Sequence, residues 1–127
     1  MLRAASLAIA LMGSTLVLAS DPNEVLRSRE DTYKPLYALK AQLDKLHKLD
    51  DKYGKYLEKL RISKPKEYLI QRDGLNELYT REFTGCLDLK QRSTYRKYIR
   101  SLREKYIKSH PEVDADNIFI WGGANIV

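Results

Sequence analysis

Residues 88–109 read DLKQRSTYRKYIRSLREKYIKS and predict the most clearly delimited helix of this chain. Asp88, with Gln91 three residues later, has the spacing of a capping box, which opens a helix. The sequence Ser109-His110-Pro111 ends it. Between these limits the apolar residues recur on one face, which consists of Tyr95, Tyr98, Ile99, Leu102, Tyr106 and Ile107.

A longer amphipathic helix is predicted before it, from Thr32 to about Leu60. Thr32 can cap this helix, and Pro35 suits its first turn. Leucines and tyrosines follow at steps of three and four residues, which is typical of a helix packed on one side. Asp50 is the one gap in this seam, and we interpret its carboxylate as a solvated charge.

The sequence Ser63-Lys64-Pro65 ends that helix and opens another, predicted from about Lys66 to Phe83. Thr84-Gly85 breaks it before the third helix begins. Three amphipathic helices joined by short breaks can bury their apolar faces only against one another. We therefore expect an all-α fold, a small antiparallel three-helix bundle with an apolar C-terminal tail.

The first twenty residues have the composition of a signal peptide. Arg3 precedes an uncharged stretch from Ala4 to Ala19, and cleavage after Ala19 or Ser20 fits the small residues there. A membrane anchor is the alternative, but this stretch is shorter than the ~20 apolar residues that span a bilayer. We expect a cleaved signal peptide (1–20), a flexible leader (21–31), a single helical domain (32–127) and a secreted, extracellular protein.

The composition of the mature chain points away from catalysis. Removal of Arg3 with the signal peptide lowers the formal net charge from +6 to +5, so the chain stays basic. Cys86 is the only cysteine; we expect it to be buried, with pairing between chains or a nucleophilic role as the alternatives. His47 and His110 are isolated and form no zinc or triad motif. We expect no enzymatic activity, cofactor or metal.

A row of arginines along the last predicted helix is the strongest candidate site. Arg92, Arg96, Arg100 and Arg103 fall on one flank of its apolar face. Guanidinium groups grip phosphate and carboxylate, and a basic helix can lie on an anionic membrane. Nucleic acid would satisfy the same charges, but a secreted protein seldom meets it. The other interpretation is a solvated face, partly neutralised by acids of the first two helices.

The apolar tail is the second candidate. Ile118, Phe119, Ile120 and Trp121 precede two glycines at the end of the chain. They could form a strand-like flap over the bundle, since a soluble monomer seldom exposes such a patch, or a segment that docks on a partner or a membrane. The nine tyrosines, against two phenylalanines, favour half-buried positions and contact surfaces.

The stretch from Leu75 to Ile99 is similar to the central helical segment of the Turandot family of insect secreted stress factors. The similarity lies in the order Tyr79, Arg81, Phe83, Leu87, Arg92, Lys97, Tyr98 and Ile99. The resemblance implies a cysteine-poor, helical humoral protein that is released under stress or infection and associates with anionic lipid.

Together these features predict a secreted binding protein that contacts an anionic lipid surface through its arginine row, in stress or immunity. The alternative is a secreted effector or a reproductive-tract protein. Such a protein would bind another secreted or cell-surface protein through its tyrosine-rich surface or its apolar tail.

Overall fold

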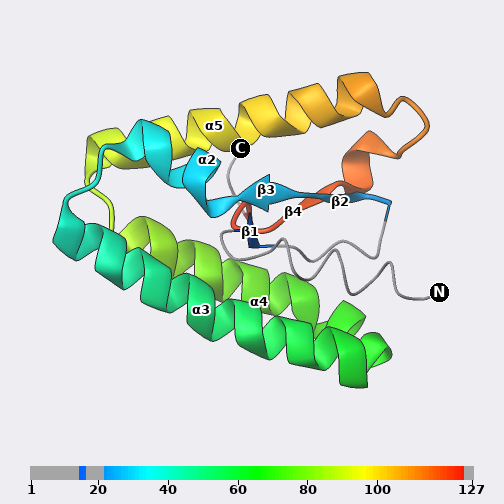
Figure 1. Cartoon of the computed structure of the whole chain (residues 1–127). Helices are drawn as coiled ribbons and strands as arrows, with labels where there is room; N and C mark the ends of the chain where they lie inside the picture. Colours follow the sequence, from blue (N-terminus) through cyan, green and yellow to red (C-terminus); the bar gives the residue numbers. More distant parts are fainter. Residues whose placement is uncertain (1–14, 17–21, 125–127) are drawn as a thin grey trace.

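The computed structural model describes residues 15–16 and 22–124, and this part of the chain is mainly helical (Figure 1). The predicted all-α class is therefore confirmed. The long helices are α3 (Lys40–Ser63), α4 (Pro65–Gly85) and α5 (Leu89–Ser109). The short helical elements are α2 (Arg29–Tyr33), η1 (Lys34–Leu36) and η2 (Ala115–Asn117). The strands are β1 (Thr15–Leu16), β2 (Glu24–Val25), β3 (Arg27–Ser28) and β4 (Phe119–Ile120).

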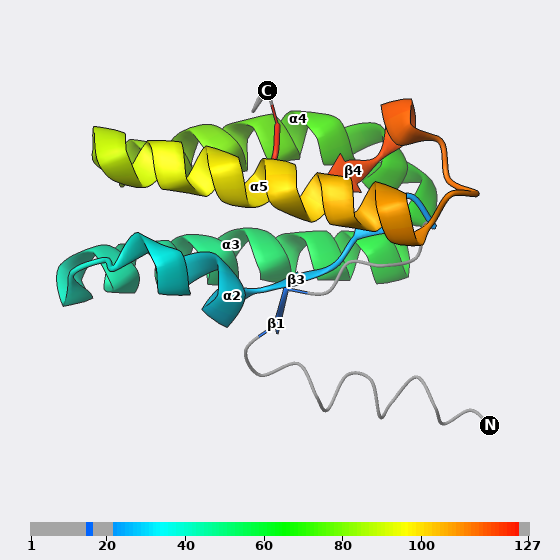
Figure 2. The ribbon, with the colours of Figure 1, turned by 90° about the horizontal axis from the view of Figure 1, so that it is seen from above.

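α3 and α4 form a helical hairpin in which Lys64 alone separates the two helices. Pro65 opens α4, where its missing N–H breaks no helical hydrogen bond. The helices lie side by side (Figure 2), and the Tyr53 ring of α3 packs edge-on against Tyr79 of α4, with centroids 5.4 Å apart. The predicted boundary between the first two helices is thus confirmed, and α4 extends to Gly85, two residues past its predicted end.

α5 begins at the predicted capping box. The Asp88 carboxylate accepts a hydrogen bond from the Gln91 backbone N–H at 2.7 Å, and the Gln91 side chain accepts one from the Asp88 N–H at 3.0 Å. Two donors that a helix start leaves unpaired are thereby satisfied. The helix ends at Ser109, with His110 as its C-cap, which confirms the predicted end.

The first predicted helix is divided in two, so the expectation of one continuous helix from Thr32 is wrong. Ser28 caps α2 by accepting the Asp31 N–H at 3.1 Å, and Thr32 lies inside this helix. Tyr37 then takes the left-handed φ of 48°, through which no α-helix continues, and α3 begins at Lys40. Glycine or asparagine usually marks such a position, so the tyrosine concealed the break.

Residues 22–31 are not a flexible leader, which corrects that prediction. β2 pairs in parallel with β4, aligning Glu24 with Phe119 and Val25 with Ile120. β2, β3 and β4 lie between α5 and the α3–α4 hairpin (Figure 1). The helices therefore bury part of their apolar faces against these extended segments, and not only against one another. Three side chains of the supposed leader are buried: Glu24, Val25 and Arg27.

Most of the predicted signal peptide lies outside the described residues. Its described part is β1, which pairs antiparallel with β3 and aligns Thr15 with Ser28. Cleavage after Ala19 or Ser20 would remove β1 and leave the β2–β4 pair in place.

The C-terminal tail belongs to the core. Phe119, Ile120 and Trp121 are buried, and Ile118 packs against them partly buried. The Trp121 ring stacks on Tyr79, with centroids 4.6 Å apart. These side chains are therefore not a free docking segment, because α3, α4 and α5 already enclose them; the docking alternative for the tail is corrected.

Candidate functional site

Two members of the predicted arginine row hold neighbouring backbone. Arg92 donates from Nε to the carbonyl oxygens of Thr84 at 2.9 Å and Leu87 at 3.1 Å, where α4 ends. Arg103 donates from Nη2 to the carbonyl oxygen of Ala115 at 2.5 Å. Both side chains are half-buried. These arginines fasten α5 to adjacent turns, so they do not form part of an open anion-binding row.

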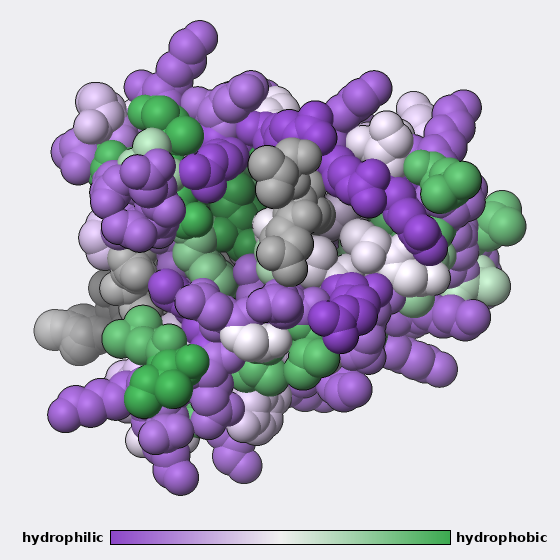
Figure 3. Space-filling view, turned by 180° about the vertical axis from the view of Figure 1, so that it is seen from behind, coloured by the Kyte–Doolittle hydropathy of each residue, from purple (hydrophilic) through white to green (hydrophobic). Residues whose placement is uncertain are grey.

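The exposed charge of α5 comes from a different set of residues. We term the basic face the six exposed basic residues of this helix: Lys90, Arg96, Lys97, Arg100, Lys105 and Lys108. Glu104 is the one acidic residue in α5. Hydrophilic side chains project along the edge of the molecule where α5 lies (Figure 3). The structure thus keeps two of the four predicted arginines on the surface, together with four lysines, and these six residues spread over the solvent-facing half of the helix.

Asp50, the gap in the predicted apolar seam, lies in the centre of the molecule. The residue is only 1% exposed, so its interpretation as solvated charge is wrong. Its carboxylate oxygens accept hydrogen bonds from the hydroxyls of Tyr33 and Tyr79, and Arg29 Nε lies 3.7 Å from Oδ2. A buried carboxylate requires such partners, because the transfer of a charged group from water into the protein interior is strongly unfavourable unless hydrogen bonds or an opposite charge compensate it.

Arg27 is the buried positive charge beside Asp50, and it is 6% exposed. It donates from Nε to the Trp121 carbonyl at 2.7 Å, from Nη1 to Thr32 Oγ1 at 2.6 Å and from Nη2 to the Tyr79 hydroxyl at 3.5 Å. Burial alone would lower the pKa of Arg27, but Tyr95, Tyr79 and Asp50 raise it by more than burial lowers it. The pKa is therefore raised overall, and the side chain stays charged. This guanidinium joins the N-terminal segment to α4 and the tail.

Tyrosine builds the core of this protein more than its surface. Burial raises the pKa of Tyr95 to about 12, and its hydroxyl donates to the Gly122 carbonyl at 2.8 Å. Burial also raises the pKa of Tyr53 to about 12, helped by its hydrogen bond to Glu82 at 2.6 Å. The five buried tyrosines are Tyr33, Tyr53, Tyr68, Tyr79 and Tyr95.

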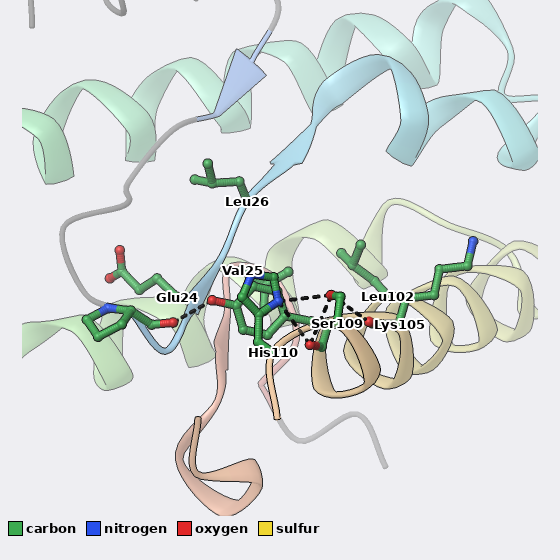
Figure 4. Close-up of a pocket in the computed structure, with 9 residues that line it drawn as sticks. Glu24, Val25, Leu26, Leu102, Lys105, Ser109 and His110 are labelled. Carbon is green, nitrogen blue, oxygen red and sulfur yellow. Dashed lines mark hydrogen bonds between the residues drawn. The ribbon is translucent and has the colours of Figure 1, made fainter. Parts of the chain in front are cut away.

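An open groove of about 540 Å³ lies where β2 meets the C-terminal end of α5 (Figure 4). The His110 ring stacks on Tyr106 at 4.0 Å, and the Tyr106 hydroxyl donates to the Pro22 carbonyl. Glu24 also lines the groove, and its carboxylate accepts a hydrogen bond from the Tyr68 hydroxyl at 2.8 Å and forms an ion pair with Arg72 at 2.8 Å. The groove is lined by Pro22, Glu24, Val25, Leu26, Leu102, Lys105, Tyr106, Ser109 and His110.

The Ser109 and His110 side chains, which line the groove at the end of α5, are hydrogen-bonded to their own helix. Ser109 lies 2.9 Å from His110 Nδ1, but the same hydroxyl bonds the Lys105 carbonyl within its own helix. Arg27 and Asp50, the two buried charges linked by the Tyr79 hydroxyl, are not among the lining residues.

The remaining candidates for chemistry are separate from one another. Cys86 is a half-buried free thiol packed against the core, and His47 is exposed with its ring 5.1 Å from that of Tyr33. Within residues 15–16 and 22–124, no cluster of three or more histidine, cysteine, aspartate or glutamate side chains could hold a metal ion. In the same part of the chain, no helix has the length and apolar character needed to cross a membrane.

Comparison of the chain with protein-family models, with curated protein sequences and with solved structures finds no match. The similarity of residues 75–99 to the Turandot family therefore stays a prediction.

Proposed function

We propose that this is a secreted, non-enzymatic binding protein, a humoral stress or immune factor, which contacts anionic membrane surfaces through the basic face of α5. The supporting observation is that six exposed basic residues share one helix with a single acid, Glu104. Export is expected from residues 1–20, and the Turandot-like stretch agrees with this function. We propose an antiparallel three-helix bundle of α3, α4 and α5 as the scaffold that presents this face.

The electrostatics of such a contact follow from the length of α5. Each basic side chain near a phosphatidylserine-containing surface contributes about 1 kcal/mol, and the attraction decays over a Debye length of about 8–10 Å. The 21 residues of α5 span roughly 30 Å. Several of its charges can therefore reach one surface only when the helix lies along it or at a shallow tilt. Binding should be strong at low salt and should weaken as salt is added.

A charge-matched pair of variants tests the proposal. One variant, Lys90→Gln/Arg96→Gln/Lys97→Gln/Arg100→Gln, removes four charges from the basic face. The control, Lys55→Gln/Lys59→Gln/Lys64→Gln/Lys66→Gln, removes four exposed charges from α3, α4 and their connection. Both variants lower the net charge by the same amount, so only the position of the charge differs.

Co-sedimentation with phosphatidylcholine vesicles, with and without phosphatidylserine, measures the binding of each variant. We expect the wild-type protein and the control to bind the phosphatidylserine vesicles at low salt, and the basic-face variant to lose most of this binding. Absence of wild-type binding, or equal loss in both variants, would contradict the proposal.

The alternative, a secreted effector or reproductive-tract protein that docks on another protein, has less support. The surfaces assigned to it are the tyrosines and the tail. Five of the nine tyrosines and three of the four tail residues are buried in the core.

A further inference from the structure

One end of the molecule exposes three large apolar side chains. Tyr37 and Leu39 lie between η1 and α3 and are 90% and 73% exposed. Leu89, the first residue of α5, is 81% exposed. Both connections lie at the same end of the ribbon (Figure 1), and hydrophobic side chains reach the surface at this end, on the right of Figure 3. We term Tyr37, Leu39 and Leu89 the apolar end.

A reciprocal pair of glutamines holds these two connections together. Gln42 Nε2 donates to Gln91 Oε1 at 2.9 Å, and Gln91 Nε2 donates to Gln42 Oε1 at 3.2 Å. Gln42 also donates to the Cys86 carbonyl at 3.1 Å, and Gln91 donates to the Leu36 carbonyl at 3.2 Å. The apolar end is therefore a preorganised surface rather than two independent loops.

Two positions of the apolar end contradict local backbone preference. Tyr37 has a φ of 48°, a left-handed conformation that favours glycine or asparagine, yet its ring gains almost no burial. Leu39 is the N-cap of α3, where serine, threonine, aspartate or asparagine would cap through the side chain. Neighbouring positions that break local rules without a gain in packing are characteristic of functional surfaces.

The charges around this end favour an anionic lipid surface. Lys34, Lys40 and Lys90 are exposed on the same connections, while the nearby Asp88 carboxylate is engaged in capping α5. Tyrosine is enriched at the headgroup level of membranes, and leucine favours the acyl boundary. Three side chains expose together on the order of 500 Å², less than the roughly 800 Å² per partner of a stable protein interface.

We propose that the apolar end inserts Tyr37, Leu39 and Leu89 into the headgroup–acyl boundary of an anionic membrane. This inference rests on the proposed function and adds an orientation to it. The protein tilts so that the start of α5 is deepest, with Lys90 among the lipid headgroups and the rest of the basic face rising along the surface.

A fluorescent probe at one position tests the insertion. In a Cys86→Ser background, the environment-sensitive nitrobenzoxadiazole group is attached at Leu89→Cys, with Ile70→Cys as the control. Ile70 is 73% exposed on α4, five residues from the start of that helix and away from the apolar end. With phosphatidylserine vesicles we expect a blue shift and brighter emission at position 89 and no change at position 70.

A second variant measures the contribution of insertion to affinity. Tyr37→Asn/Leu39→Ser/Leu89→Ser keeps residues compatible with the left-handed and N-cap positions and should weaken vesicle binding by about tenfold. Circular dichroism, together with the fluorescence of buried Trp121, the only tryptophan, reports whether the variant is folded.

The outcomes separate this inference from the proposed function. If the wild-type protein does not bind the vesicles, the proposed function fails and the inference fails with it. If the protein binds but the probe at position 89 does not shift and the triple variant keeps its affinity, insertion is refuted and the basic-face contact stands. A wild-type dimer that the triple variant converts to a monomer would instead assign the apolar end to self-association and overturn insertion.

Discussion

Replacing Asp50 by asparagine removes one negative charge from the centre of the molecule and keeps the size of the side chain. The change removes the negative charge that faces Arg29 at 3.7 Å and that helps to keep buried Arg27 charged, and one of the two tyrosine hydroxyls then faces an amide N–H₂ in place of an acceptor oxygen. Because no cavity forms, the effect isolates the charge and its hydrogen bonds.

The expected loss is large compared with the stability of a small domain. Removing one charge from a buried, hydrogen-bonded cluster of charges costs about 3–5 kcal/mol, whereas domains of this size are stable by roughly 5–15 kcal/mol. A loss of that size lowers the Tm by more than about 10 °C. The neighbouring Asp51→Asn variant is the control, because Asp51 is half exposed in its 2.7 Å ion pair with Arg29 and should contribute less than about 1 kcal/mol.

Equilibrium unfolding in urea measures both variants, followed by far-ultraviolet circular dichroism and Trp121 fluorescence. Asp50→Asn should shift the midpoint to much lower urea with little change in the slope, and Asp51→Asn should barely move it. If the two variants lose the same small amount of stability, the buried cluster is not what holds the N-terminal segment to the helices.

Two further predictions concern backbone conformation and pH. Gly122→Ala should destabilise the fold by more than about 2 kcal/mol, because φ is 83° and the added Cβ would lie 2.6 Å from Arg27 Nη2. Gly74→Ala, which has open space around it inside α4, should instead stabilise the fold by about 0.5–1 kcal/mol. Thermal unfolding compares the two variants, and equal effects would contradict the packing described. The pKa values of Tyr53 and Tyr95 are raised to about 12, so the contribution of these phenols to stability is complete below pH 10 and is lost as the pH rises toward 12. Ultraviolet titration of the phenols should therefore show steep, cooperative ionisation that coincides with unfolding. Nine independent ionisations near pH 10 would refute this prediction.

The helix boundaries set by local chemistry could be predicted from the sequence. The capping box of Asp88 and Gln91, the stop after Ser109 and the start at Pro65 each depend on residues within one turn of the helix end. The division near Tyr37 could not be predicted in this way, because the residue before it, Leu36, is buried and its carbonyl accepts a hydrogen bond from Gln91, far away in the sequence.

The candidate site was predicted only in part, for a related reason. Helical periodicity placed four arginines on one flank of α5, but it could not show that Arg92 and Arg103 bond to the carbonyls of adjacent turns. The apolar end combines residues 37–39 with Leu89, which are about fifty positions apart, so no local pattern joins them. Asp50 left a signal, a charged residue in an apolar seam, but its partners come from two other helices, α2 and α4.

The sequence by itself determined the helical class, the start of α4, both ends of α5 and the excess of basic residues on the last helix, because each follows from neighbouring side chains along one element. Only the tertiary structure decided that β2, β3 and the tail lie between the helices, that Asp50 and Arg27 are both buried, and which basic residues face solvent. Those outcomes depend on which distant segments meet, and a buried charge can be satisfied only where such segments bring its partners to it.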